Sequence, residues 1–246
     1  MKPPRVIGHR GACAHAPENT LAAFRLAAEM CGWAELDVDL LADGTVVVCH
    51  DRTLERTTTG SGRVEEATWD DVAGLDAGGW FDPRFAGEPL ARLSDVIDLA
   101  NEVGLSINVE LKSPLGGAEI ARRLVAATAA QLRRLDPGCD VIVSSFNHLM
   151  LPLMAAEGEW PLACLFEAGQ LGEDWRTRAE LAGARILHPC LPDVTAGLVT
   201  EMRAAGYRVN VWTVNDPEDA RALARMGVDG IITNDPEAIR AAIAQV

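Results

Sequence analysis

Acidic and aliphatic side chains alternate in the segment Glu35-Leu36-Asp37-Val38-Asp39-Leu40. Successive side chains of a strand point to opposite faces, so the segment predicts a strand with its carboxylates on one face. A strand of a parallel sheet is covered on both faces, and carboxylates buried there are costly unless something positive neutralises them. We therefore favour a metal site on this strand. The alternative is a salt-bridged strand end in contact with solvent.

A second polar-faced strand follows farther along the chain. Asn108, Glu110 and Lys112 are expected on one face of it, with aliphatic residues on the other. It adds a carboxylate and a cation to the site. Carboxylates without thiolates or a clustered pair of histidines favour a hard divalent cation, Mg²⁺ or Ca²⁺, over zinc. The alternative is a Glu110–Lys112 ion pair that only neutralises itself.

Two histidines end predicted strands, and each is followed by a charged residue: His9 by Arg10, and His50 by Asp51. A single histidine is usually structural, but these two flank the carboxylates. Imidazole titrates near neutral pH, so one neutral and one protonated ring can act as base and acid. We interpret His9 and His50 as an acid–base pair.

These side chains need a scaffold, and the chain alternates β-branched runs with amphipathic helical segments. The expected strands are Arg5–His9, Ala34–Leu40, Leu105–Lys112, Asp140–Phe146, Leu162–Glu167, Arg185–His188, Arg208–Val214 and Gly230–Thr233. The expected helices are Glu18–Met30, Leu93–Val103, Ala118–Leu135, His148–Ala156, Asp174–Ala182, Thr195–Ala205, Pro217–Met226 and Pro236–Ala244. Eight such units predict an α/β fold, a (β/α)₈ TIM barrel forming one domain over residues 1–246. A doubly wound open sheet is the alternative.

One unit is irregular. The Asp43-Gly44 turn predicts a further short strand, Thr45–Cys49. Residues 51–92 are then rich in Thr, Gly and Trp, with little periodicity. Because long loops in compact domains are usually functional or disordered, we expect an inserted subdomain beside the barrel mouth.

Composition restricts the partners. The net charge of −14 disfavours nucleic acid, because an acidic surface repels polyanions. The six cysteines are scattered without a Cys-x-x-Cys pair, which favours reduced thiols. The first residues contain no apolar signal core, and no apolar run approaches the length of a membrane span. We expect a cytoplasmic protein that acts on a small molecule and has no stable membrane association.

Seven segments, in order, resemble the glycerophosphodiester phosphodiesterase family: "HRGACAHAPENT", "ELDVDL", "VVCHDRTLERTT", "NVELK", "SSFN", "VWTVND" and "DGIITND". Each motif alone is weak, but the ordered set is specific and runs from Ile7 to about Glu237. The resemblance implies a (β/α)₈ barrel with a small insertion after the "HD" motif. It also implies a divalent cation and hydrolysis of glycerophosphodiesters to glycerol 3-phosphate and an alcohol.

The resemblance also assigns roles, position by position. It implies metal ligands at Glu35, Asp37 and Glu110, acid–base catalysis by His9 and His50, phosphate binding by Arg10 and Lys112, and a contact of Trp212 with the glycerol carbons. For Trp212 a plain barrel-core aromatic is the alternative. The family often has Asp where Asn234 stands, and we expect either residue to cap the following helix. Which histidine is the acid stays open.

Two other functions remain as alternatives. A phospholipase C-like or lysophospholipase D activity on lipids would need an apolar or basic lipid-facing surface, which the acidic composition disfavours. Trp80, Phe81 and Phe85 in the insertion could still admit a lysolipid. A non-catalytic phosphate-ligand binding barrel is less favoured, because both histidines and all three carboxylates are present.

Overall fold

Strands arranged side by side close into a ring in the computed structural model of the protein, which describes residues 5–244 and 246. Within those residues eight parallel strands form the ring, and pairing of the first with the second closes it. They are β1 (Arg5–Gly8), β2 (Trp33–Leu40), β4 (Ser106–Leu111), β5 (Val141–Ser145), β6 (Leu162–Phe166), β7 (Ile186–Pro189), β8 (Arg208–Val211) and β9 (Gly230–Thr233). The predicted TIM barrel is confirmed, and the open-sheet alternative is wrong. The predicted domain also includes residues 1–4 and 245, which lie outside the described residues.

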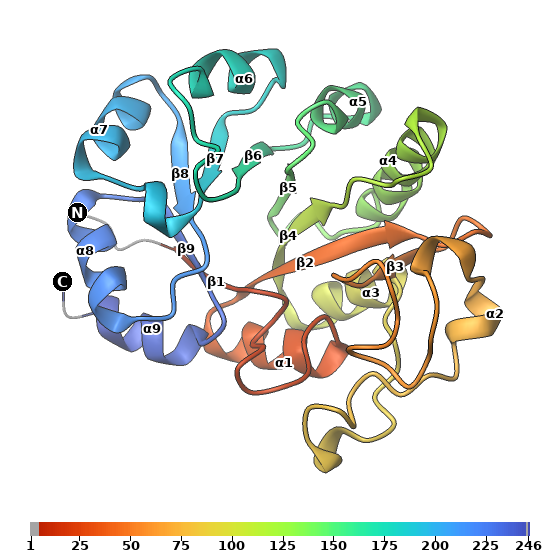
Figure 1. The fold of residues 1–246 in the computed structure, drawn as a ribbon. Helices are drawn as coiled ribbons and strands as arrows, with labels where there is room; N and C mark the ends of the chain where they lie inside the picture. The colour runs from red at the N-terminus through yellow and green to blue at the C-terminus, as the bar shows by residue number, and fades with distance from the viewer. Residues whose placement is uncertain (1–4, 245) are drawn as a thin grey trace.

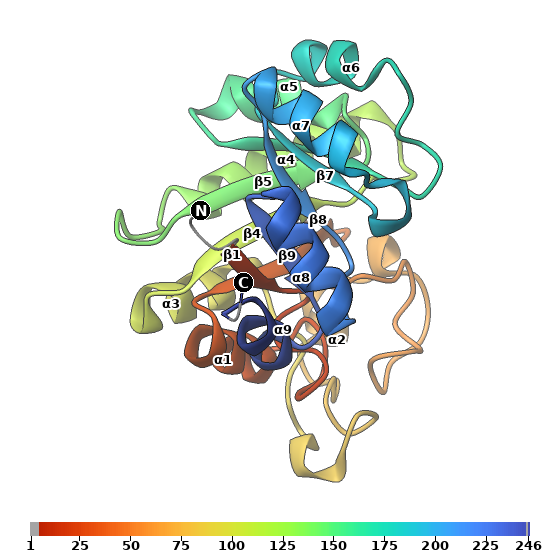
Figure 2. The same ribbon diagram turned by 90° about the vertical axis from the view of Figure 1, so that its left-hand side faces the viewer.

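Helices cover the outside of the ring (Figures 1 and 2). They are α1 (Leu21–Met30), α3 (Leu93–Val103), α4 (Ala118–Leu132), α5 (Met150–Glu157), α6 (Trp175–Leu181), α7 (Ala196–Ala204), α8 (Pro217–Met226) and α9 (Pro236–Ile243). The predicted bounds of α3 and α8 are correct. Helix α1 begins three residues later than predicted, because Thr20 is its N-cap and accepts a hydrogen bond from the Ala23 N–H. Among the described helices, none is both long and apolar enough to cross a membrane.

The two faces of the barrel strands have different neighbours. Leu36, Val38 and Leu40 of β2 point outward into the large core beneath the helices. Inside the ring a smaller apolar cluster fills the barrel; its members are Ile7, Trp33, Ile142, Ala163, Ile186 and Ile232. Polar side chains at alternate strand positions also face inward, and Glu35 and Asp37 of β2 line a cavity at the end of the barrel.

Residues 41–92, between β2 and α3, form an arm outside the ring. Strand β3 (Val46–Val48) pairs with β2 in antiparallel register, with Val38 opposite Val48. The chain then forms the short helices η1 (Val64–Glu66), α2 (Trp69–Val72) and η2 (Pro83–Phe85), which the sequence analysis did not predict. This segment extends beyond the ring of helices (Figures 1 and 2). It has its own apolar cluster, which includes Leu54, Val64 and Val72. The division into a barrel and an inserted subdomain stays a prediction.

Candidate active site

A cavity of about 280 Å³ lies where the barrel strands end. Its lining contains all eight predicted site residues: His9, Arg10, Glu35, Asp37, His50, Glu110, Lys112 and Trp212. It also contains Asn108, Phe146, Leu165, Glu167 and Ile232. Lys112, Phe146 and Glu167 each directly follow the last residue of a barrel strand, as expected for a site at the carboxyl face.

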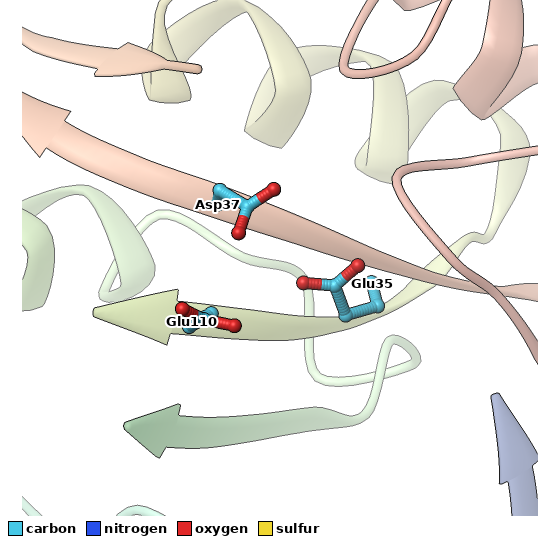
Figure 3. Close-up of side chains that lie close together, drawn as sticks. All are labelled: Glu35, Asp37 and Glu110. Atoms are coloured by element: carbon cyan, nitrogen blue, oxygen red, sulfur yellow. The ribbon is translucent and has the colours of Figure 1, made fainter. Parts of the chain in front are cut away.

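Three carboxylates meet on two neighbouring strands. Asp37 of β2 lies opposite Glu110 of β4 in the parallel register, and Glu35 lies two residues earlier on the same face of β2. One oxygen of each carboxylate lies within 4.8 Å of one oxygen of each of the others. Figure 3 shows the three carboxyl groups gathered over the two strands. The register of β2 and β4 therefore brings the three predicted ligands together.

The electrostatics of this trio call for a cation. Burial, together with the neighbouring charges of Asp37 and Glu110, raises the pKa of Glu35 well above its ordinary value. Burial and the Asp37 carboxylate raise the pKa of Glu110 to about 8. Three buried carboxylates at this spacing repel one another when ionised, and a divalent cation relieves that repulsion. The all-oxygen donor set fits a hard divalent ion.

The loop after β1 folds tightly around the trio. Arg10 has a left-handed backbone conformation, with φ of 51°, which is uncommon for a residue other than glycine. Its backbone N–H donates to Glu35 Oε2 (2.8 Å), and its Nε lies 3.4 Å from Asp37 Oδ2. The Asn19 amide donates to Asp37 Oδ2 at 2.9 Å. The loop thus holds a guanidinium group against the carboxylates.

His9 sits at the start of this loop. Its Nδ1 lies 2.8 Å from Asn234 Oδ1, and its Nε2 lies 4.0 Å from Glu35 Oε2. An amide oxygen only accepts, so the contact places the ring proton on Nδ1 and leaves the Nε2 lone pair available. Burial and the Arg10 charge lower the pKa of His9, which favours the neutral ring. The expectation that Asn234 caps the last helix is wrong, because Asp235 is the N-cap of α9.

His50 reaches the cavity from the arm, two residues after β3 ends. Its Nδ1 lies 2.7 Å from Asp51 Oδ1. Arg56 in turn donates two hydrogen bonds to Asp51 and two to Glu18. The sequence analysis did not single out Glu18 and Arg56, although both lie in the motifs that contain His9 and His50.

An aromatic wall bounds part of the cavity. Trp212 packs against the apolar cluster inside the barrel, while its indole N–H donates to the His188 carbonyl at 2.9 Å. The rings of Trp212 and Phe146 meet edge to face at a centroid distance of 5.3 Å. Trp212 is therefore both a packing residue and part of the cavity lining. Glu167 was missed, although its place directly after a strand is the signal that identified His9.

Comparison with known proteins gives the chain its relatives. The model of the Glycerophosphoryl diester phosphodiesterase family matches residues 9–238. A glycerophosphodiester phosphodiesterase of Caldanaerobacter subterraneus subsp. tengcongensis is 37% identical over 237 residues, which cover 95% of each chain. The structure of an Oleispira antarctica phosphodiesterase, in complex with the product sn-glycerol-3-phosphate, matches with a TM-score of 0.93 at 32% identity, covering 98% of this chain and 97% of that one.

A second solved structure agrees. The structure of a candidate glycerophosphoryl diester phosphodiesterase from Silicibacter pomeroyi matches with a TM-score of 0.88 at 30% identity. The match covers 100% of this chain and 95% of that one. The likeness therefore extends over the whole barrel and the arm, beyond the cavity alone.

Proposed function

The chain belongs to the glycerophosphoryl diester phosphodiesterase family, and from this we propose that it hydrolyses glycerophosphodiesters to glycerol 3-phosphate and an alcohol. It is a hydrolase of phosphoric diesters. The observation that carries the proposal is the cavity, which brings together three carboxylates, two cationic side chains and two imidazoles. Hydrolysis of a phosphodiester needs each of these: charge neutralisation at the phosphate, a base and an acid.

We propose that Glu35, Asp37 and Glu110 hold one divalent cation, Mg²⁺ or Ca²⁺. When bound, such an ion neutralises charge on the non-bridging phosphate oxygens. The raised pKa of Glu110 and the oxygen spacing within 4.8 Å support this assignment. Because the trio is part of the cavity lining, we place the phosphate beside it.

Arg10 and Lys112 are the proposed phosphate-binding side chains. Arg10 is fixed by its contacts with Asp37 and Glu18, so its guanidinium is oriented before the substrate arrives. Lys112 directly follows β4, the strand that contains Glu110. Trp212 presents its exposed surface to the cavity, where we place the carbons of the glycerol. These contacts would hold the phosphorus in line with the attacking and leaving oxygens.

We assign His9 as the base and His50 as the acid. The free Nε2 of His9 takes a proton from water, or from the substrate's own glycerol hydroxyl to give a transient cyclic phosphate. The new P–O bond forms as the bond to the leaving oxygen breaks, and the His50 Nε2–H protonates that oxygen. In the cyclic route His50 then takes a proton from water, which attacks phosphorus, and the His9 Nε2–H protonates the ring oxygen as its bond to phosphorus breaks, which gives glycerol 3-phosphate. The neutral state of His9, favoured by burial, and the bond from His50 Nδ1 to Asp51 support this order.

The test is release of glycerol 3-phosphate from a panel of glycerophosphodiesters, first with chelator and then with each divalent ion restored. His9→Ala and His50→Ala should each lose at least about 100-fold in kcat, because a general acid or base contributes roughly that much. Their melting temperatures should stay near that of the unchanged protein. Near-normal turnover in either variant would remove that histidine from the mechanism.

A lysophospholipid is the second candidate substrate. Trp80, whose exposed fraction is 44%, meets Phe81 edge to face at 5.7 Å in the arm, so an aromatic surface is present there. Including a lysophospholipid in the panel separates the two substrates. We propose the water-soluble diester and a cytoplasmic location, in line with the acidic composition. A non-catalytic binding barrel is set aside, because the chain belongs to a family of hydrolases.

A further inference from the structure

A chain of ion pairs connects the two loops that bear the histidines. Arg10 Nη1 donates to Glu18 Oε1 at 2.8 Å, and Arg56 donates to both oxygens of Glu18 at 2.7 and 2.8 Å. The same Arg56 guanidinium donates to both oxygens of Asp51 at 2.6 and 2.9 Å. Asp51 then contacts His50 Nδ1. Glu18 and Arg10 belong to the loop before α1, and the other residues belong to the arm.

Arg56 joins the two halves of this chain, because its guanidinium contacts Glu18 on one side and Asp51 on the other, and it is not among the residues that line the cavity. Its planar fork satisfies two carboxylates at once, an arrangement that a lysine ammonium cannot reproduce. Glu18 is largely buried, with 13% of its side chain exposed. Hydrogen bonding to Arg56 lowers the pKa of Asp51. Burial raises the pKa of Glu18, but hydrogen bonding to Arg56 and the Arg10 charge outweigh it, so that this pKa is also lowered. Both carboxylates are therefore ionised at neutral pH and would repel each other without the guanidinium.

We propose that Arg56 is a positioning residue: by fixing Asp51 it sets the orientation of the His50 ring, and through Glu18 it ties the arm to the loop that holds Arg10. This inference rests on the proposed function. The imidazole and its carboxylate partner are adjacent in sequence, so neither restrains the other unless one is held from outside. The Arg56 fork supplies that external restraint.

The geometry distinguishes Arg56 from Glu18. When Arg56 is lost, Glu18 still pairs with Arg10, so phosphate binding is retained while the acid is misplaced. Arg56→Gln should therefore lower kcat by about 10- to 100-fold, the usual cost of losing a supporting hydrogen-bond partner, with little change in KM. Glu18→Gln loosens Arg10 as well, so it should lower kcat and also raise KM.

The matched control is Arg84→Gln. Arg84 lies in the same arm and pairs with Asp82, but its side chain is 79% exposed and it is not among the residues that line the cavity. This control should keep the kcat of the unchanged protein. Arg56→Lys should recover only part of the loss, because an ammonium has three N–H donors and cannot make the four hydrogen bonds of the guanidinium. Added guanidinium ion should restore part of the kcat of Arg56→Ala, whereas methylammonium should not.

The measurements are kcat and KM for glycerol 3-phosphate release, with the melting temperature of every variant. An Arg56→Gln variant with the kcat of Arg84→Gln would overturn the inference. The inference would also be overturned if Arg56→Ala lost kcat, guanidinium did not restore it, and the melting temperature fell enough to explain the loss. If the unchanged protein turns over and His50→Ala does not, while Arg56→Gln is normal, this inference alone fails. No turnover by the unchanged protein on any diester would refute the proposed function itself.

Discussion

Gly11 offers a quantitative test of how tightly the loop after β1 is built. Its φ is 83°, and a Cβ at this position would lie 2.7 Å from the carbonyl carbon of Ala23 and 2.7 Å from its Cβ. Real Cβ contacts do not come this close, so α1 or the loop must move. The Gly11 N–H also donates to the Glu35 carbonyl at 3.1 Å. A change at Gly11 therefore reaches the loop that contains His9 and Arg10.

Two costs add in Gly11→Ala. The left-handed backbone costs a residue with a Cβ about 1–2 kcal/mol. The overlap with Ala23 adds about 1–3 kcal/mol, the usual range for overpacking a well-filled site. We expect the free energy of unfolding to fall by roughly 2–5 kcal/mol. Because the loop must shift, kcat/KM should also fall, by about 10-fold or more.

The control isolates the overlap. Gly104 ends α3 with φ of 69°, and a Cβ there would meet nothing within 4 Å. Gly104→Ala should therefore lose only the backbone cost, about 1–2 kcal/mol, and keep full activity. Urea unfolding and glycerol 3-phosphate release give both quantities. Equal losses of stability in Gly11→Ala and Gly104→Ala would refute tight packing of the loop against α1.

Three further outcomes are expected. The pKa of Glu110 is raised from 4.5 to about 8, so between these pH values the cation-free folded chain keeps a proton that the unfolded chain releases. The free energy of unfolding should therefore fall as the pH rises from about 4.5 to about 8. Urea titrations with chelator measure this slope, and Glu110→Gln should flatten it. Asn234→Leu removes the oxygen that orients His9 and should lower kcat about 10-fold, whereas Asn234→Asp keeps an acceptor and should retain activity. Trp212→Leu should raise KM more than it lowers kcat; unchanged KM would place the glycerol elsewhere.

Periodicity predicted much of the site because the chemistry lies on strands. The alternation through Glu35 and Asp37 fixes which face of β2 is polar, and the same rule applies to Glu110 on β4. A closed parallel barrel then requires those faces to point inward. What periodicity could not give is the register that sets Asp37 opposite Glu110, since register depends on how all the strands close.

Polar contacts between residues far apart in the chain could not be predicted from the sequence either. His9 and Asn234 are 225 positions apart, and they meet only because β1 pairs with β9. The general preference of Asn and Asp for N-caps led us to expect that Asn234 caps the last helix, whereas Asp235 does so. In the sequence, Glu18 and Arg56 are indistinguishable from surface charges. They meet because the arm lies against the loop before α1. The short helices of the arm have too little periodicity to predict.

His50 follows β3, a strand that pairs with β2 but does not belong to the ring. Length changes between residues 51 and 92 therefore leave the shear of the barrel intact, since no barrel strand passes through that segment. The arm can therefore diverge in length and sequence independently of the three carboxylates on β2 and β4. A chimaera that exchanges this segment between relatives should keep its cation affinity, because the three proposed ligands, Glu35, Asp37 and Glu110, lie on β2 and β4.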